Sequence, residues 1–238
     1  MDRLRDRVIL VTGAAQGMGL ATAIRCSDEG AHVIACDIAP GAASERITPV
    51  LLDVADEQSW ATAIAQVTED HGRLDGLVNN AGVIGYSAIL DTTLEEWNRV
   101  LSVDLTGVFL GMRASLPLMI ASGGGSIVNF SSIWGLAAVS SAHAYHAAKG
   151  AIGNMTKNVA VTHATDGIRA NSLHPGHILT PLTERQDQAT SDIVIGKTAM
   201  KRPGRAEEIA ATVAFLLSDD SSYMTGTEVV VDGGYLAQ

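Results

Sequence analysis

Cysteine is scarce in this sequence, because only Cys26 and Cys36 occur among 238 residues. They form neither a Cys-x-x-Cys pair nor a zinc-type spacing, so the sequence has no disulfide framework and no cysteine-based metal centre. We expect both to be small buried hydrophobic residues in a reducing compartment, and we predict no metal site.

Positive charge is also in short supply. The chain has 16 Lys and Arg against 26 Asp and Glu, a formal net charge of −10, and its basic residues are scattered. Nucleic-acid binding requires a concentrated basic face, so nucleic acid is not an expected partner. A hydrophobic fraction of 47% with 18% charged residues is typical of a soluble globular protein.

Long apolar runs are missing as well. The runs "VILVTGAA" and "GSIVNF" are too short to cross a bilayer. The amino-terminal "MDRLRDRVILVTG" has charges but neither the long apolar region nor the small-residue cleavage site of a signal peptide. We therefore expect a soluble, cytoplasmic protein with no membrane partner.

Short β-branched runs alternate with longer helical stretches along the chain. Most of the runs are continuously apolar, which is typical of parallel strands covered on both faces. Strands are predicted at 7–12, 32–37, 47–53, 74–80, 126–132, 168–174 and 227–233, and helices at 17–29, 56–71, 93–121, 144–164 and 206–217. The alternation predicts an α/β fold, a single Rossmann-type doubly wound domain over 1–238 with a seven-stranded, mostly parallel sheet and helices on both faces.

Two segments interrupt this alternation. Residues 38–47 leave room for barely two turns of helix between the second and third strands. Residues 181–204 have weak periodicity and end in a loop signal. Because long irregular segments in compact domains are usually lids or binding loops, we predict a substrate lid at about 181–204.

A glycine-rich turn follows the first predicted strand and opens a helix. Its glycines are Gly13, Gly17 and Gly19, in the order G-x-x-x-G-x-G. A dinucleotide site needs such glycines for a tight turn and for close approach to the pyrophosphate, which then meets the free N–H groups of the helix N-terminus. The strand before the turn and the helix after it favour a dinucleotide-binding turn, whereas "SGGGS" at 122–126 precedes a strand and is interpreted as a plain turn.

Asp37 ends the second predicted strand. A carboxylate at this place can bond the adenosine ribose hydroxyls and repels a 2′-phosphate, so NAD is expected in preference to NADP. The alternative interpretation is an exposed aspartate in a turn.

Tyr145 and Lys149 lie four residues apart in "YHAAK", within a predicted helix. Residues at i and i+4 share one helix face, so both side chains can reach one bound molecule. A phenol on the helix surface beside a solvated lysine has the same spacing, and the spacing by itself leaves both interpretations open.

Motifs along nearly the whole chain resemble the short-chain dehydrogenase/reductase family. "TGAAQGMG" at 12–19 resembles its cofactor turn, "DV" at 53–54 its adenine-contacting step and "NNAG" at 79–82 its signature after the fourth strand. "NFSS" at 129–132 stands thirteen residues before Tyr145, as the family's serine does, and "HPGHILTP" at 174–181 resembles its P-G-x-x-x-T segment.

The resemblance implies an alcohol dehydrogenase or ketoreductase with catalytic Ser132, Tyr145 and Lys149. Tyr145 is the general acid/base, and an unperturbed phenol titrates near ~10. We expect Lys149 and the oxidised nicotinamide to lower that pKa. Ser132 would donate a hydrogen bond to the substrate oxygen, and only the thirteen-residue spacing favours it over Ser131.

The same resemblance implies a set of cofactor-binding residues. They are Gly13, Gln16, Gly17, Met18, Gly19, Asp37, Asp53, Val54, Asn80, Ala81, Gly82, Tyr145, Lys149, Pro175, Gly176, Ile178 and Thr180. Asp104 departs from the pattern, because the family usually has an asparagine there that helps to hold a water in a proton relay. An ionised aspartate cannot donate hydrogen bonds. Either the relay is rearranged or Asp104 pairs with a cation.

The expected substrate is a hydrophobic secondary alcohol or ketone. Residues expected at the substrate pocket by position are Ser132, Tyr145, Val83, Trp134, His143 and His177, with Ile193, Val194, Ile195 and Met200 from the lid. These apolar groups favour a cyclic, aromatic or steroid-like molecule. A β-ketoacyl thioester is the alternative, although the acidic chain offers no evident basic site for an acyl-carrier protein.

Two other functions are alternatives to a dehydrogenase on this kind of fold. A catalytically impaired NAD-binding regulatory protein would retain the fold, because function depends on the site. A sugar epimerase or dehydratase usually has a larger carboxyl-terminal domain than the residues after Pro181 can form. The resemblance also implies a homotetramer built through 93–121, 144–164 and 227–231.

Overall fold

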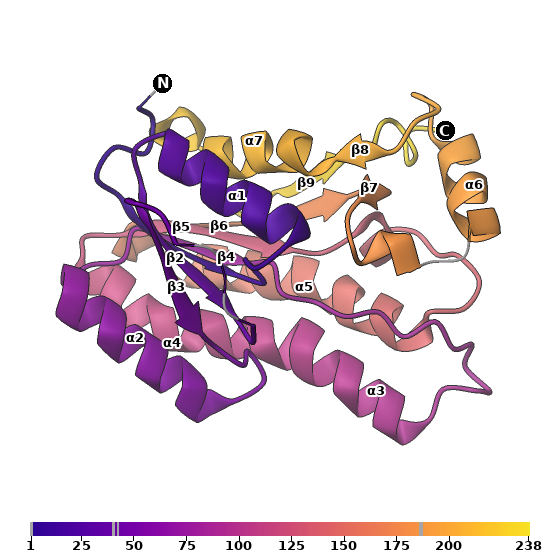
Figure 1. The fold of residues 1–238 in the computed structure, drawn as a ribbon, viewed down its shortest axis with the longest axis horizontal. Coiled ribbons are helices and arrows are strands. Elements are labelled where there is room, and N and C mark those ends of the chain that lie inside the picture. The colour runs from indigo at the N-terminus through magenta and orange to yellow at the C-terminus, as the bar shows by residue number, and fades with distance from the viewer. Residues whose placement is uncertain (1, 40, 42, 186–187) are drawn as a thin grey trace.

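One parallel sheet of seven strands organises the protein in a computed structural model, which describes residues 2–39, 41, 43–185 and 188–238 (Figure 1). Its strand order is β3-β2-β1-β4-β5-β6-β9. The strands are β1 Val8–Thr12, β2 His32–Asp37, β3 Ile47–Leu51, β4 Gly76–Asn79, β5 Gly125–Phe130, β6 Ile168–Pro175 and β9 Glu228–Val231. The predicted doubly wound α/β fold is confirmed, and every pairing in this sheet is parallel.

Helices cover both faces of the sheet. Figure 1 shows α1 and α7 along one face, with α2, α4 and α5 on the opposite face. The helices are α1 Gly17–Asp28, α2 Glu57–His71, α3 Leu94–Leu101, α4 Gly107–Ala121, α5 His143–Thr162, α6 Gln188–Lys197 and α7 Ala206–Leu217. The two layers of helices shield the backbone of the central strands from water.

Strand β1 shows why the sequence pattern predicts this arrangement. Ile9 and Val11 belong to one core cluster, whereas Val8 and Leu10 belong to the other. Successive side chains of a strand point to opposite faces, so a strand covered on both sides must be apolar at every position. All five residues of β1 are accordingly buried.

The stretch predicted as one helix over 93–121 is helical but not uniform. A π-helical turn, Ser102–Thr106, joins α3 to α4. Among the described residues, this stretch (Leu94–Ala121) is the one helix long and apolar enough to span a membrane. It packs against α2, α5 and the sheet, so it is a core helix of a soluble protein.

The predicted lid segment contains a helix that its sequence pattern did not indicate. Helix α6 occupies 188–197, with only Ser191 and Val194 buried, so it has no apolar stripe for a pattern to reveal. Two short strands, β7 Ile178–Leu179 and β8 Gly204–Arg205, pair with each other on either side of the segment. Residues 186–187 of the predicted lid lie outside the described residues.

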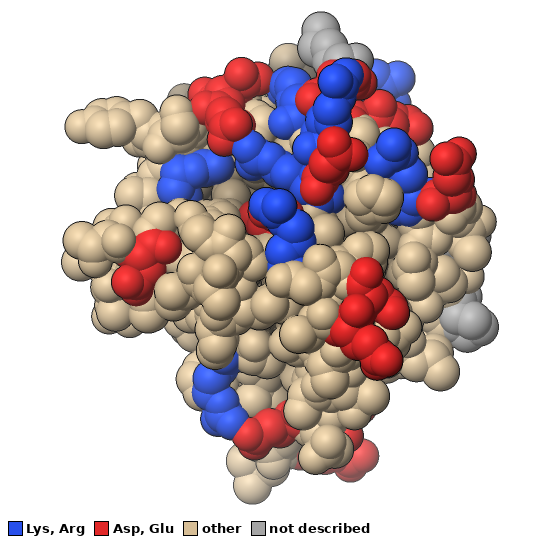
Figure 2. Space-filling model, turned by 90° about the vertical axis from the view of Figure 1, so that its left-hand side faces the viewer, with Lys and Arg blue, Asp and Glu red and all other residues tan. Residues whose placement is uncertain are grey.

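Charged side chains gather near the chain's start. Figure 2 shows Lys and Arg mixed with Asp and Glu on this face of the molecule. Arg3 pairs with Glu29 at 2.7 Å and Arg7 with Asp219 at 2.6 Å. The basic groups of this face are therefore largely matched by carboxylates.

The order of strands fixes where a ligand site can form. The chain runs outward through β1, β2 and β3 and then returns to place β4 on the other side of β1. Loops leaving the carboxyl ends of β1 and β4 diverge at this point, which opens a crevice.

Candidate active site

The glycine turn after β1 has the conformation that a phosphate-binding turn requires. Gly13 and Gly17 have φ values of +65° and +58°. A Cβ atom at Gly19 would lie 2.0 Å from the carbonyl oxygen of Gly13, so only glycine fits there. Helix α1 begins at Gly17, and the side chain of its N-cap Gln16 makes no capping hydrogen bond. The first-turn N–H groups of α1 are thus not capped by Gln16.

Side chains from the neighbouring strand ends brace this turn. Asp37 Oδ2 accepts a hydrogen bond of 3.0 Å from the Ala15 N–H, and its Oδ1 accepts one of 3.2 Å from the Ala39 N–H. Asn80 Nδ2 donates to the carbonyl oxygens of Thr12 and Gly13 at 2.9 and 3.2 Å. The ends of β1, β2 and β4 therefore meet at one rigid turn.

Asp53 and Val54, also expected at the cofactor, make local contacts at the start of the segment before α2. Asp53 Oδ1 accepts a hydrogen bond from the Ala55 N–H at 2.9 Å, and the Val54 carbonyl accepts one from Trp60 Nε1 at 3.0 Å. The segment after β6 closes the crevice, because a Cβ atom at Gly17 would lie 3.4 Å from the Thr180 side chain.

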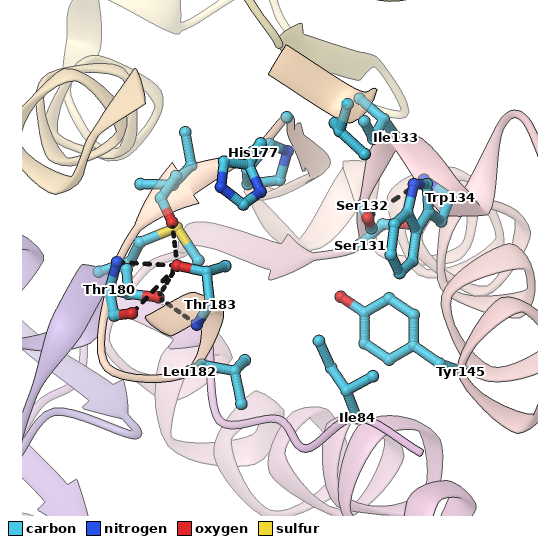
Figure 3. Close-up of a pocket in the computed structure, with 15 residues that line it drawn as sticks. Ile84, Ser131, Ser132, Ile133, Trp134, Tyr145, His177, Thr180, Leu182 and Thr183 are labelled. Carbon is cyan, nitrogen blue, oxygen red and sulfur yellow. Dashed lines mark hydrogen bonds between the residues drawn. The ribbon is translucent and has the colours of Figure 1, made fainter. Parts of the chain in front are cut away.

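A cavity of about 80 Å³, here called the inner cavity, joins the glycine turn to the YHAAK helix (Figure 3). Residues of the sequence-predicted site that line it are Met18, Ser132, Trp134, Tyr145, Pro175, Gly176, His177, Ile178, Thr180 and Val194. Figure 3 shows the Tyr145 hydroxyl directed toward Ser132, with Thr180 and His177 across the cavity. The structure thus brings the glycine turn, the serine motif, the YHAAK helix and the 174–181 segment to one cavity.

The two serines of "NFSS" have different surroundings. Ser131 Oγ donates a 2.8 Å hydrogen bond to the Lys149 carbonyl, deep in the protein. Ser132 Oγ accepts one of 3.1 Å from the Trp134 N–H, and Ser132 also lowers the pKa of the Tyr145 phenol. Ser132 is consequently the serine next to the Tyr145 hydroxyl.

Lys149 lies within a buried charge pair. Its Nζ is 3.1 Å from Asp104 Oδ2 and donates a 3.0 Å hydrogen bond to the Phe130 carbonyl. Asp104 is fully buried in the π-helical turn, and its Oδ1 accepts a 2.8 Å hydrogen bond from the Val83 N–H. Oδ2 itself has no hydrogen-bond donor in good geometry. A Cβ atom at Gly82 would come within 3.1 Å of this oxygen, so the glycine makes room for the pair.

The surroundings of Tyr145 act on its pKa in opposite directions. Burial raises the pKa of the Tyr145 phenol and outweighs Lys149, which lowers it. Asp104 adds to the rise because its negative charge disfavours a phenolate. Burial lowers the pKa of Lys149, but Asp104 and Tyr145 together outweigh burial and raise it. Within the protein, the expected lowering by Lys149 is therefore offset by burial and by Asp104.

His143 is not brought to the inner cavity. Its ring instead lies 6.0 Å from that of Trp97 on α3. It stands two residues before Tyr145, and a helix turns through about 200° over two residues, so the two side chains leave α5 on opposite sides. Pattern analysis missed His146, whose ring stacks on Trp134 at 5.5 Å with an interplanar angle of 3°. Only the fold places these two rings together.

Comparison with known proteins identifies the family of this chain. The family model described as Enoyl-(Acyl carrier protein) reductase matches residues 13–236. A cyclopentanol dehydrogenase of Comamonas sp. (strain NCIMB 9872) is 39% identical, with 100% of both chains covered. The chain belongs to the short-chain dehydrogenase/reductase family.

Other short-chain dehydrogenases are similarly close. A 3-alpha-(or 20-beta)-hydroxysteroid dehydrogenase of Mycobacterium tuberculosis (strain ATCC 25618 / H37Rv) is 42% identical and covers 99% of this chain and 91% of its own. The crystal structure of a levodione reductase superposes with a TM-score of 0.93 at 36% identity, covering 98% of each chain. The protein is therefore an oxidoreductase acting on CH–OH donors with an NAD(P) cofactor.

Proposed function

We propose that this protein is an NAD-dependent dehydrogenase that interconverts a hydrophobic cyclic secondary alcohol and its ketone. One observation supports this most directly. Met18 from the glycine turn and Tyr145 from the YHAAK helix line the same cavity. A dinucleotide held at the turn and an alcohol held at Tyr145 would meet in that cavity. The whole chain, 1–238, would act as one domain, with 181–204 as its lid.

The residues present fit a dinucleotide. The glycine turn with its left-handed backbone and the N-terminus of α1 suit the pyrophosphate, while Asp37 stands where a ribose would bind. NAD, when bound, supplies the acceptor or donor of the hydride. Asn80, Ala81, Gly82 and the 175–180 segment would hold its nicotinamide half beside Lys149.

Three side chains would take part in proton transfer at the substrate oxygen. In oxidation, Tyr145 takes the proton from the carbinol oxygen, and in reduction it returns a proton to the carbonyl oxygen. Ser132 donates a hydrogen bond to that oxygen. Lys149 pairs with Asp104 and favours the phenolate form of Tyr145. In this pair, Asp104 would position the ammonium group of Lys149. With a dinucleotide bound, Lys149 would also hold its ribose hydroxyls.

The lining of the inner cavity favours an uncharged reacting group. Its apolar residues include Ile84, Trp134 and Leu182. Among the described lining residues His177 is the one histidine, and burial lowers its pKa, which favours the neutral imidazole. The relatives named for cyclopentanol and for hydroxysteroids also act on ring alcohols. A cyclic alcohol suits these surroundings best.

An NAD-linked oxidation screen tests the proposal. Cyclopentanol, cyclohexanol, a hydroxysteroid, a terpene alcohol and a β-hydroxyacyl thioester would each be offered with NAD⁺ while NADH formation is followed. We expect turnover of at least one ring alcohol at a kcat/KM well above that of the acyl thioester. Preference for the thioester, or no turnover of any ring alcohol, would contradict the proposal.

Asp37 should set the choice of cofactor. Like charges brought together at a binding site cost several kcal/mol, so we expect kcat/KM for NAD⁺ to exceed that for NADP⁺ by about 100-fold or more. Asp37→Ala combined with Ile38→Arg should reverse or abolish this preference, because Ile38 is 76% exposed and next to the ribose site. Asp37→Asn is the matched control, since it keeps an oxygen for the Ala15 N–H while removing the charge. Equal use of both cofactors by the unaltered protein would refute the assignment.

We further propose a cytoplasmic homotetramer. Each of the three elements expected at its interfaces has an exposed apolar side chain, namely Phe109 on α4 (44% exposed), Val161 on α5 (82%) and Val230 on β9 (42%). Association would remove these groups from water. Light scattering should give four times the chain mass at micromolar concentration, and a monomer mass would rule the proposal out.

A further inference from the structure

A second cavity adjoins the inner one. This outer cavity has a volume of about 680 Å³ and lies between residues 138–142 and helix α6. It shares Trp134 and Val194 with the inner cavity. Figure 1 shows α6 near the carboxyl terminus, at the end of the molecule where β7 lies. The two cavities are therefore neighbouring compartments with a common wall.

The sizes of the compartments limit how a ring can bind. The inner cavity measures about 80 Å³. An engineered cavity of roughly 150 Å³ is known to hold a benzene molecule. The outer cavity adjoins the inner one at Trp134 and Val194, so it offers space for the part of a ring that lies beyond the carbinol carbon at Tyr145.

The shared wall is held in place by His146. The Trp134 indole stacks on this imidazole, and His146 Nε2 accepts a 3.2 Å hydrogen bond from the Val139 N–H. Its other nitrogen, Nδ1, then donates to the Ala142 carbonyl at 2.8 Å. Val139 and Ala142 both line the outer cavity, so one hydrogen-bonded unit forms its wall and orients Trp134. Ile193 and Val194 form the apolar side on α6.

Charge distinguishes the two compartments. No lysine, arginine, aspartate or glutamate lines the inner cavity among the described residues. In the described lining of the outer cavity, Lys197 is the one such residue. None of the described carboxylates lies within ion-pair distance of its ammonium group. Lys201, by comparison, donates its ammonium to the Gly196 carbonyl at 2.6 Å and does not line the outer cavity.

We propose that the outer cavity binds the far end of the substrate and that Lys197 pairs there with a carboxylate. The preferred substrates would then be cyclic secondary alcohols that carry an acid group across the ring from the carbinol. The apolar walls hold the ring, and the single cation selects the anionic end. This inference rests on the proposed dehydrogenase function and specifies its substrate class.

Paired substrates test the role of Lys197. 4-Hydroxycyclohexanecarboxylate and its uncharged carboxamide have nearly the same shape, so the ratio of their kcat/KM values reports the charge preference. We expect the unaltered protein to prefer the acid, and Lys197→Gln to lower kcat/KM for the acid about fivefold while leaving the carboxamide unchanged. Lys201→Gln is the matched control and should change neither value. The preference for the acid should also shrink as salt is added.

Two results would overturn the inference. Equal losses for acid and carboxamide in Lys197→Gln would mean that Lys197 only stabilises the last turn of α6, where a cation is favoured. If Lys197→Gln changes kcat/KM for neither substrate, the acid group lies elsewhere.

Calorimetry separates this inference from the proposed function. If no ring alcohol is oxidised, the proposed function fails. Binding of cyclohexanecarboxylate still tests whether Lys197 binds a carboxylate in the outer cavity. About fivefold tighter binding to the unaltered protein than to Lys197→Gln supports it, and equal binding refutes it.

Discussion

Replacing Tyr145 with Phe should lower kcat by about 10²–10⁴-fold, the usual contribution of general acid/base catalysis. The substitution removes only the hydroxyl. The ring keeps its edge-to-face contact with Trp134, whose centroid lies 5.9 Å away. The fold and the cofactor turn should therefore be unaffected, and NADH should bind with nearly unchanged affinity. Steady-state kinetics and NADH fluorescence titration measure the two quantities.

A second tyrosine supplies the control for this variant. Tyr223 is fully exposed, so Tyr223→Phe should leave kcat unchanged. If Tyr145→Phe keeps more than about a tenth of the turnover, the loss is smaller than a general acid/base would give, and Tyr145 is a packing residue.

Removing the carboxylate of Asp104 should destabilise the protein by about 3–5 kcal/mol, because Asp104→Ala leaves Lys149 buried without its counter-ion. The ammonium would keep only the Phe130 carbonyl as a described hydrogen-bond acceptor. Asp104→Asn is the matched variant, since it retains the volume and an oxygen for the Val83 N–H. Urea unfolding with linear extrapolation compares the three proteins. A loss of less than about 1 kcal/mol in Asp104→Ala would show that the pair does not stabilise buried Lys149.

The same pair should shape the pH profile. Alcohol oxidation needs the phenolate of Tyr145, so its rate rises with pH through the tyrosine pKa. Among the groups acting on that pKa, burial, Asp104 and Tyr86 raise it, whereas Lys149 and Ser132 lower it. Asp104→Asn removes one raising charge, and the rising limb should move to lower pH. A limb that stays in place or moves to higher pH would contradict this electrostatic role.

Much of the cofactor turn could be predicted from residue order. Gly13, Gly17 and Gly19 sit between a strand and a helix, and that local context already determines a tight turn opening onto a helix N-terminus. Tyr145 and Lys149 share a face because they are four residues apart on one helix. Such features depend on neighbouring residues, whose geometry the backbone fixes.

Other features needed contacts between distant segments. The resemblance marked Asp104 as unusual but left its partner open, and the fold pairs it with Lys149 from another helix. The same Asp104 opposes the lowering of the Tyr145 pKa by Lys149, an effect that residue spacing did not reveal. His143 was expected at the substrate pocket by its position in the chain, yet the helical turn directs it to Trp97.

The sequence by itself determined the α/β alternation, the parallel sheet and the dinucleotide turn, because apolar periodicity and glycine placement act over a few residues. The tertiary structure decided which charges neutralise one another and how the substrate space is divided. Lys197 of α6 lines the outer cavity together with the distant 138–142 segment, and His146 stacks on Trp134 in its wall. Burial and long-range contact set these properties, and neither is encoded in the spacing of residues along the chain.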